Sequence, residues 1–424
     1  MKEKYRHPIH INLDKCKGCV HCLTACPTKA IRVRDGKASI IGELCIDCGE
    51  CVRFCPEDAI ESRTTSFFDL RAFKYKVAIP ATVLYGQFDN ATQPNEILFA
   101  LRRVGFDTVY EISTVCELNN AAINKYIHAH PKPRPLIAST CPVVVRLIQR
   151  RFPSLIDMIV PIEPPREIAA KILRANLPRV LKVSPKDIGI LHITPCSAKM
   201  VSINYPVSME KSYLDGAISI RDIYKPIVQA LRQSKQETIM SHLFPETIFS
   251  GIGLGTALSG GETRGLKNHR TVAVSGIQDT IRVLNQVELG LLKDVDLLEC
   301  MVCPDGCVGG PLAVENRYLA KSRILRLVNL LGERTVVDDS DMSLLYHKHF
   351  MSFSNPIKPI PSPPLDPNPT RAIQKAKRRS KLTKKLPGKN CGACGAPDCR
   401  TLADDVVRGL AALDACPFMP KEKK

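Results

Sequence analysis

Hydrophobic and polar residues alternate in blocks through the middle of the chain, between residues 73 and 350. Short apolar runs there predict buried strands over 76–88, 135–140, 187–196 and 269–276. Between these runs, apolar residues recur at helical spacing over 94–105, 141–152, 165–177 and 279–292. Strands that alternate with helices predict an α/β domain with a largely parallel sheet.

The N-terminal end of the chain contains an internal repeat. The segment CKGCVHCLTACP (16–27) recurs 29 residues later as CIDCGECVRFCP (45–56). The residues between the two copies predict a short hairpin that turns around Asp35 and Gly36. The pattern therefore indicates a small duplicated module that ends near residue 65.

The C-terminal end has three further segments. Residues 354–370 carry seven prolines, which is typical of an extended linker. The basic run at 371–390 predicts a helix, and residues 401–413 have apolar positions at helical spacing. Within the central domain, SGIGLGTALSGGE (250–262) lacks the spacing of a phosphate-binding loop, so we interpret it as a structural glycine turn.

Together these patterns predict an α+β multidomain chain with four segments. They are a duplicated module (1–65), a central α/β domain (66–350), a proline-rich linker with a basic helix (351–386) and a small helical domain (387–424). No apolar run reaches the length of a membrane span, and the first residues lack the apolar stretch of a signal peptide. We therefore expect a cytoplasmic protein.

Cysteine usage changes this picture most. The 18 cysteines fall into tight clusters, which in a reducing compartment indicates metal binding. The formal net charge is +18, and each cluster held by four thiolates would offset it by about two charges. The basic run at 371–390 is interpreted first as a solvated helix face, with docking of an acidic protein or of nucleic acid as the alternatives. Trp is absent and aromatic residues make up only 5%, which argues against nucleic acid.

The N-terminal repeat gives the most specific cysteine pattern. C-x2-C-x2-C-x3-C-P, present twice, is typical of two-cluster ferredoxins, in which the fourth cysteine ligates the other cluster. The spacing is a poor match to zinc sites, and disulfides do not persist in a reducing compartment. The pattern predicts two 4Fe–4S clusters, one held by Cys16, Cys19, Cys22 and Cys55, and the other by Cys26, Cys45, Cys48 and Cys51.

A third group of cysteines lies near the C-terminus, with C-x2-C-x4-C-x16-C spacing. Glycines at 392 and 395 let the backbone wrap a bulky group, although spacing alone leaves zinc as an alternative. The segment CGACGAPDC (391–399) resembles the small iron–sulfur domain of several anaerobic redox enzymes. This resemblance favours one 4Fe–4S cluster on Cys391, Cys394, Cys399 and Cys416.

Three segments of the central domain resemble the signature segments of iron-iron hydrogenases. They are ASTCPVVVRLI (138–148), ITPCSAKM (193–200) and ECMVCPDGCVGGP (299–311). Two further stretches, IPATVLYGQF (79–88) and GFDTVYE (105–111), are similar to segments that flank the site in that family. The resemblance implies an H-cluster, which is a 4Fe–4S cubane joined through one cysteine sulfur to a diiron unit with CO, cyanide and azadithiolate ligands.

The resemblance also implies a ligand set. Cys141, Cys196 and Cys303 would ligate the cubane, and Cys307 would ligate it and bridge to the diiron unit. The C-x3-C spacing of the last two cysteines predicts that they sit on adjacent helical turns. Lys199 matches the lysine that hydrogen-bonds a cyanide ligand, which suits a compact ammonium facing an anion.

Other residues of the expected site follow from the same resemblance. Met301 matches the methionine that packs beside the diiron unit, and Pro80 and Ala81 match the loop that approaches the second cyanide. Gly309 and Gly310 are expected to keep side chains out of the space that this unit occupies.

Several positions depart from the family pattern. Thr140 stands where turnover enzymes have the cysteine that passes protons to the bridging amine, and a hydroxyl is a far weaker acid than a thiol. Thr194 and Ser202 replace a methionine and a glutamate, and the stretch 119–126 lacks the paired glutamates that lead protons outward. These changes, with the appended C-terminal cluster domain, resemble the divergent sensory branch of the family.

Two cysteines stay outside the predicted ligand sets. Cys116 and Cys300 are interpreted as structural, and Cys300, Glu299 and Glu117 are alternative proton carriers.

Three functions are compatible with the sequence. The first is a slow, sensory iron-iron hydrogenase, which needs hydrogen, protons, maturation proteins and a ferredoxin-type or separate signalling partner. The second is a full-turnover, ferredoxin-linked hydrogenase with another proton route. The third is an iron–sulfur electron carrier or assembly protein that lacks the diiron unit.

Overall fold

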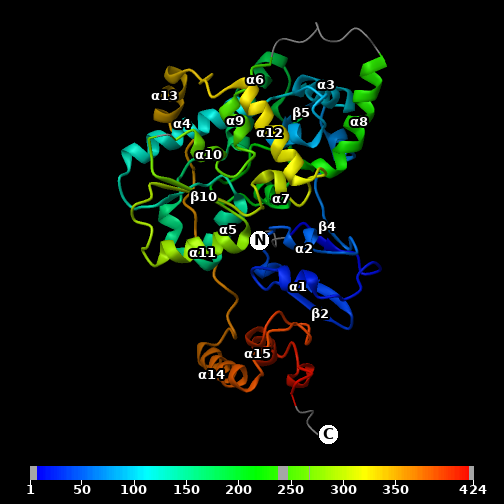
Figure 1. Cartoon of the computed structure of the whole chain (residues 1–424), viewed down its shortest axis with the longest axis vertical. Helices are drawn as coiled ribbons and strands as arrows, with labels where there is room; N and C mark the ends of the chain where they lie inside the picture. Colours follow the sequence, from blue (N-terminus) through cyan, green and yellow to red (C-terminus); the bar gives the residue numbers. More distant parts are fainter. Residues whose placement is uncertain (1–6, 237–246, 267, 420–424) are drawn as a thin grey trace. The chain divides into compact units, whose positions relative to one another are not determined.

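The computed structural model describes residues 7–236, 247–266 and 268–419. The chain forms two compact units, one of Met1–Arg63 with Pro361–Lys424 and the other of Thr64–Ile360 (Figure 1). The first unit therefore combines the two cysteine-rich ends of the chain, and the second contains the central domain.

Two parallel sheets form the centre of the second unit. One sheet has the strand order β6-β5-β8-β9, from Thr108–Val109, Tyr75–Pro80, Ile188–Thr194 and Gly216–Ser219. The other has the order β10-β11-β7, from Thr271–Ser275, Leu297–Met301 and Leu136–Ile137. β8 is buried along its whole length, as a continuous apolar strand of a covered parallel sheet should be. The predicted α/β architecture is confirmed.

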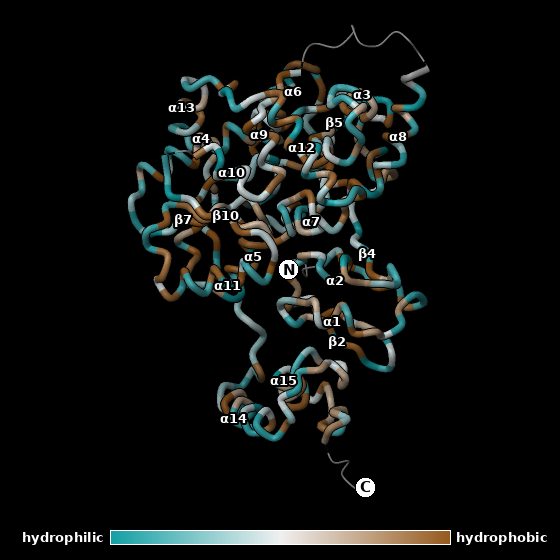
Figure 2. The backbone as a smooth tube through the Cα atoms, in the orientation of Figure 1, coloured by the Kyte–Doolittle hydropathy of each residue, from teal (hydrophilic) through white to brown (hydrophobic). Residues whose placement is uncertain are grey.

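Helices pack against these sheets and enclose hydrophobic cores. In Figure 2 the strands β7 and β10 lie among hydrophobic segments, and the buried side chains of the described residues include two large clusters in this unit. The helices are α3 (Pro94–Val104), α4 (Ser113–Ala129), α5 (Pro142–Arg151), α6 (Pro165–Leu181), α7 (Ser197–Asn204), α8 (Ile220–Gln236), α9 (Gly251–Gly255), α10 (Gly261–Arg264), α11 (Ile277–Glu288), α12 (Arg317–Leu331) and α13 (Asp339–His347).

Two of the sequence-based element predictions for this unit need correction. The strand expected over 76–88 ends at Pro80, and Thr82–Gln87 forms a buried 3-10 helix instead. Periodicity cannot separate a buried strand from a buried helical turn in a run that is apolar throughout. Strand β11 was not predicted, because its apolar residues are interrupted by Glu299, which is fully buried.

The N-terminal part of the first unit is a small α/β module. Strands β1 (Ile9–Ile11) and β4 (Ile60–Ser62) pair antiparallel. Strands β2 (Ile31–Arg34) and β3 (Lys37–Ile40) form the predicted hairpin, with Asp35 and Gly36 at φ 50° and 71° in its turn. The short helices α1 (His21–Ala25) and α2 (Glu50–Arg53) occupy equivalent places in the two repeats.

The C-terminal part of the same unit contains two helices. The basic run forms α14 (Pro369–Lys385), coloured mostly hydrophilic in Figure 2, and the predicted helix in the last cysteine group is α15 (Cys399–Val407). Asp398 is the N-cap of α15, and its side chain accepts the Thr401 N–H. The helix ends at Val407, before Gly409 at φ 75°, and so is shorter than the pattern to residue 413 predicted. Across the described ranges, no helix combines the length and apolarity needed to cross a membrane.

Candidate metal centre

A pocket lies where the carboxyl ends of the two parallel sheets of the second unit meet. The chain reaches Cys141 just after β7, Cys196 just after β8 and Cys303 just after β11. These three thiols and that of Cys307 line the same pocket. The structure thus brings together all four cysteines of the central ligand set, at the edge where open α/β sheets place their ligands. We call this hollow the cysteine pocket.

Two of the four cysteines lie at the N-termini of helices. Cys141 is the N-cap of α5 and Cys196 is the N-cap of α7, and Pro142 occupies the first position of α5. The unpaired N–H groups at a helix N-terminus favour negative charge nearby. Thiolates, or an anionic group bound to them, are therefore stabilised at these two positions.

Cys303 and Cys307 are held by a tight loop and not by a regular helix. Asp305 and Gly306 have φ of 61° and 96°, and a short 3-10 turn, Cys307–Gly309, follows. The expectation of adjacent helical turns was therefore wrong, because left-handed residues interrupt any helix here. Asp305 fixes the loop through ion pairs with Arg317 at 3.2 Å and Lys321 at 2.8 Å. The loop still presents both thiols to the pocket.

Lys199 adds positive charge to the cysteine pocket. It lies in α7 and lines the pocket beside Cys196. Burial raises the pKa of the Cys196 thiol to about 11, and the Lys199 ammonium acts in the opposite direction. Burial likewise raises the pKa of Cys307, again against Lys199. Thiols this buried need a bound metal to become thiolates, because metal coordination deprotonates them outright.

The walls of the pocket suit a bulky anionic group. Ala138, Val143, Val302 and Met301 supply apolar surface, and Gly310 leaves the wall without a side chain. Four thiols, two helix N-termini and one ammonium fit an iron–sulfur cofactor of the kind that the sequence predicted. Across the described residues, no three His, Cys, Asp or Glu side chains are arranged to hold a single metal ion.

The remaining predicted pocket residues have mainly backbone roles. A Cβ on Gly309 would meet the Pro304 carbonyl oxygen at 2.1 Å, so this glycine is required by close packing of the loop. Pro80 is the last residue of β5, and the Ala81 N–H donates to the Ile193 carbonyl at 2.9 Å. That N–H is therefore already hydrogen-bonded to strand β8. Contact of these residues with a cofactor stays a prediction.

A buried pair of carboxyl groups, Glu262 and Glu299, adjoins Thr140. The sequence suggested Glu299 as a candidate but not Glu262. The Thr140 hydroxyl donates to Glu262 Oε1 at 2.9 Å. Glu262 lines the pocket from α10, and burial, together with the charge of Glu299, raises its pKa. Glu299 lies on β11 and accepts the N–H groups of Gly260 and Thr263 at 2.8 and 2.9 Å. The only signal for Glu262 in the sequence was its place as an acid at the end of the glycine-rich, largely apolar stretch 250–262.

The other residues that we considered as proton carriers differ in position. Cys300 lines the cysteine pocket from β11, where burial raises its pKa. Cys116 is buried in α4, and burial raises its pKa to about 12. Glu117 accepts the Ser250 hydroxyl and the Val336 N–H, which ties α4 to two other segments. Glu117 thus has a structural role, and Cys300 stays a candidate.

The N-terminal cysteines gather into two sets in the first unit. Cys16, Cys19, Cys22 and Cys55 line one small pocket. Burial raises the pKa of Cys48, and the neighbouring thiols that add to this rise are Cys51, Cys26 and Cys45. Each set therefore contains three close cysteines of one repeat and the fourth cysteine of the other, as the spacing predicted. Assignment of these sets as cluster ligands stays a prediction.

Backbone N–H groups point at sulfurs in both repeats. The Ala30 N–H donates to Cys26 Sγ at 3.2 Å, and the Ala59 N–H donates to Cys55 Sγ at 3.3 Å. The two bonds are related by the same 29-residue repeat that the sequence shows. Such bonds stabilise sulfur that carries negative charge, which is how proteins adjust the potential of iron–sulfur clusters.

The C-terminal cysteines lie around the start of α15. Cys399 is the first residue of the helix, and its N–H donates to Asn390 Oδ1 at 3.0 Å. Cys394, Cys399 and Cys416 belong to one small hydrophobic cluster, whereas Cys391 is exposed. Gly392 and Gly395 have φ of 74° and 72°, so the loop between Cys391 and Cys399 uses the left-handed conformations that favour glycine.

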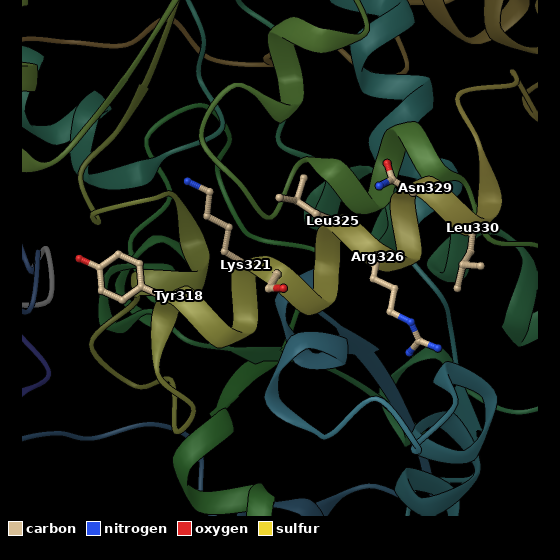
Figure 3. Close-up of a pocket in the computed structure, with 7 residues that line it drawn as sticks. Tyr318, Lys321, Leu325, Arg326, Asn329 and Leu330 are labelled. Carbon is tan, nitrogen blue, oxygen red and sulfur yellow. The ribbon is translucent and has the colours of Figure 1, made fainter.

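A second hollow of the central unit lies along one helix and has a different character. Its lining comes from α12 alone and includes Tyr318, Lys321, Leu325 and Arg326 (Figure 3). It has no cysteine in its lining, and Tyr318 and Leu330 are largely exposed. This hollow is an exposed helix face and is separate from the cysteine pocket.

The fold and the four cysteine sets define an iron–sulfur protein with a two-cluster module and a larger α/β domain. A family model described as "Iron only hydrogenase large subunit, C-terminal domain" matches residues 74–311, which is more than half of the chain. The chain therefore belongs to the iron-only hydrogenase family. A "4Fe-4S dicluster domain" model matches residues 8–56, and an iron–sulfur cluster model matches 386–418.

Curated relatives agree at low identity. The chain is 23% identical over 314 residues to Iron hydrogenase 1 of Clostridium pasteurianum, covering 60% of this chain and 53% of that protein. It is 22% identical over 222 residues to the NADP-reducing hydrogenase subunit HndD of Solidesulfovibrio fructosivorans, covering 44% and 38%. The match thus spans about half the length of the first relative and less than half the length of the second.

Two further comparisons concern the fold and a short segment. The solved structure of apo [FeFe]-hydrogenase HydA1 from Chlamydomonas reinhardtii matches with a TM-score of 0.50 at 16% identity, covering 68% of this chain and 95% of that chain. This similarity is one of fold. The cytosolic Fe-S cluster assembly factor NAR1 homolog of Schizosaccharomyces japonicus is 32% identical over only 69 residues, 16% of this chain and 13% of that protein.

Proposed function

We propose that this protein cleaves hydrogen heterolytically and reversibly at an H-cluster in the cysteine pocket, at a low rate suited to hydrogen sensing. The observation that carries the proposal is the convergence of Cys141, Cys196, Cys303 and Cys307 with Lys199 in one pocket. The cofactor, when bound, supplies the open iron site and the basic amine at which hydrogen splits. The location is proposed to be the cytoplasm.

The chain's own residues have three proposed tasks. The four cysteines would hold the cofactor, with Cys307 as a ligand to both of its parts. Lys199 presents an ammonium to an anionic ligand, and Met301 fills apolar space beside it. Thr140 and Glu262 provide a hydrogen-bonded pair through which a proton can move from the pocket to a buried carboxyl.

Slow turnover is the finer part of the proposal. A threonine hydroxyl is a far weaker acid than the cysteine thiol of turnover enzymes, so proton movement at Thr140 should limit the rate. A specific observation favours the alternative of full turnover: Glu262 accepts a hydrogen bond from Thr140 and offers another proton acceptor. The two functions differ in rate and share the same site.

Infrared spectroscopy of the matured protein tests the cofactor directly. Protein produced with hydrogenase maturation proteins is expected to show CO and cyanide stretching bands and slow hydrogen oxidation with a dye acceptor. The carrier or assembly alternative predicts iron and sulfide in the protein but none of these bands. Absence of the bands after maturation, in protein with a full complement of iron, would contradict the hydrogenase proposal.

The electron partner is proposed to be an acidic, ferredoxin-type carrier. α14 exposes Lys377, Arg378, Lys381, Lys384 and Lys385. On the same helix Arg379 is paired with Asp404 of α15 at 2.9 Å, so the face that carries Arg379 is turned toward α15 and the lysines lie on the exposed side. A row of exposed cations of one sign raises the association rate of an acidic partner by steering it electrostatically.

Charge reversal on this helix is expected to slow electron exchange with an acidic ferredoxin. The triple variant Lys377→Glu, Arg378→Glu, Lys381→Glu should lose about tenfold or more of the association rate at low salt, with little loss at high salt. Stopped-flow reduction by a ferredoxin measures this rate, and reduction by a small dye should be unchanged.

A matched control reverses three exposed lysines of the other unit, Lys182, Lys186 and Lys225. It keeps the same change in net charge but leaves α14 intact. Equal slowing in both triple variants would contradict docking at α14 and indicate only an effect of net charge. If added nucleic acid binds α14 but the charge reversal leaves the rate of reduction by ferredoxin unchanged, the nucleic-acid interpretation is favoured instead.

A further inference from the structure

The two cysteine-rich ends of the chain share one interface inside the first unit. The side chain of Asp405 on α15 accepts hydrogen bonds from Arg32 Nε at 2.6 Å and from Arg34 Nη2 at 2.9 Å. Asp405 is 1% exposed and Arg32 7% exposed, so the pair is buried between the hairpin β2-β3 and α15. Removal of one partner from such a buried pair is strongly destabilising, because it leaves the other charge buried and uncompensated.

The cysteine-bearing loop of the C-terminal part takes part in the same interface. Arg34 Nη1 donates to the carbonyl of Cys394 at 2.7 Å. The next carbonyl, that of Gly395, accepts the Val33 N–H at 3.0 Å. Lys29 forms an ion pair with Asp398, directly before Cys399. Strand β2 is therefore hydrogen-bonded along the loop that carries the C-terminal cysteine set.

The backbone approach is so close that only glycine fits. A Cβ on Gly395 would lie 1.7 Å from the Val33 carbonyl oxygen, and Gly395 also has φ of +72°. A Cβ on Gly392 would come within 3.3 Å of Leu23 Cδ2. The two glycines that let this loop wrap its cysteines are also the points at which it touches the N-terminal module.

The residues on the other side of this contact border the first N-terminal cysteine set. Val33 lines the small pocket formed by Cys16, Cys19, Cys22 and Cys55. Leu23 follows Cys22 directly and is fully buried. Val33 thus lines the pocket of one cysteine set, and its N–H donates to the carbonyl of Gly395, the residue after Cys394 of the other set.

We propose that Val33 and Gly395 form the contact across which the C-terminal cysteine set and the set of Cys16, Cys19, Cys22 and Cys55 exchange electrons. One electron passes in each event, and no bond is formed or broken. A low-potential, one-electron carrier protein supplies or accepts that electron at the C-terminal set, whose Cys391 is exposed. The inference rests on the cysteine assignments of the proposed function but does not depend on hydrogen chemistry.

Magnetic interaction between reduced clusters tests the proposal without the diiron unit. The full chain, with its iron–sulfur clusters reconstituted and reduced by dithionite, is examined by electron paramagnetic resonance together with the variant Cys416→Ala. We expect lower iron content in the variant, together with loss of the spin–spin interaction features that the C-terminal cluster adds to those of the two N-terminal clusters. Interaction features that are the same in the two proteins, or equal iron content in the two proteins, would overturn the proposal.

Glycine variants then locate the contact. Gly395→Ala is expected to lose the same interaction features, because the new Cβ displaces the loop from Val33, and its iron content is measured alongside so that loss of the contact is separated from loss of the cluster. Gly409→Ala is the matched control, since Gly409 has a similar φ of +75° but open space around its Cβ position. It should keep the features. Interaction that is retained in Gly395→Ala would show that the electrons do not cross at this contact.

A second variant covers the case in which Gly395→Ala fails to fold. Asp405→Asn removes the charge that Arg32 and Arg34 share but keeps the size of the side chain. The interaction features should weaken in this variant while iron content stays the same. Features that persist at wild-type strength in Asp405→Asn would contradict the proposed contact. Infrared bands play no part in these measurements, so failure of the hydrogenase proposal is distinguished from failure of this one.

Discussion

Replacement of Cys307 with alanine is expected to abolish the infrared bands of the matured protein and to reduce hydrogen oxidation below detection. Cys307 is the sulfur that we propose to join the two parts of the cofactor, and it lines the same pocket as Lys199, directly after the tight loop at Gly306. Loss of a ligand that both parts share would remove the attachment of the diiron unit. Infrared spectroscopy and iron analysis after maturation measure both effects.

Cys300→Ala is the matched control for this variant. Cys300 is a buried thiol of the same pocket, but it lies within strand β11 and outside the proposed ligand set. The infrared bands should survive in Cys300→Ala. Bands that persist in Cys307→Ala, or that vanish equally in both variants, would show that the ligand set has been assigned wrongly.

The second large effect is expected at Glu262. Glu262→Gln keeps the size of the side chain and an oxygen to accept the Thr140 hydroxyl, but it removes the proton-carrying carboxyl. Loss of one positioned acid or base typically costs about 10²- to 10⁴-fold in rate, so hydrogen turnover should fall in that range. The infrared bands should be unchanged, because Glu262 is not a proposed ligand. Turnover equal to that of the wild type would exclude this proton route.

The pH dependence of the same variant gives a second measurement. Burial and the neighbouring Glu299 raise the pKa of Glu262, so the carboxyl stays protonated at pH values where an exposed carboxyl is ionised. Hydrogen oxidation must deliver a proton, and only the ionised form can accept one. Oxidation by the wild type should therefore increase as the pH rises through this raised pKa, and Glu262→Gln should lack that increase.

Thr140 separates the sensory from the full-turnover function. Thr140→Cys supplies the thiol that turnover enzymes have at this place, and Thr140→Val removes the hydroxyl without changing the shape. If Thr140 limits the rate, the cysteine variant should be faster and the valine variant slower than the wild type. A wild type that is already fast, with no change in either variant, would favour full turnover and show that proton movement does not depend on Thr140.

The sequence was sufficient where the chemistry is local along the chain. The two ferredoxin-type runs and the C-terminal group are each recognised by short spacings, and the structure gathers Cys16, Cys19, Cys22 and Cys55 around one pocket and Cys394, Cys399 and Cys416 in one cluster. The family resemblance extended this to Cys141, Cys196, Cys303 and Cys307, which line one pocket although they are far apart in sequence. The alternating pattern also predicted the parallel sheets correctly.

The sequence was insufficient where two distant segments meet. Thr140 and Glu262 are separated by 122 residues, and no periodicity indicates that a short helix brings one to the other. The conformation between Cys303 and Cys307 was also misjudged, because the spacing of two cysteines does not report the left-handed residues Asp305 and Gly306 between them. In the same way, the pairing of Asp405 with Arg32 requires a folded chain to be seen.

The composite nature of the first unit has a consequence for biosynthesis. Asp405 is translated 373 residues after Arg32, so a nascent chain presents the hairpin β2-β3 before α15, which pairs with Arg32 through Asp405, has been made. Until then the Arg32 guanidinium can be solvated, so no buried charge is left unpaired. The contact between the two cysteine-rich ends of the chain is therefore the last to form, after the central domain has been synthesised.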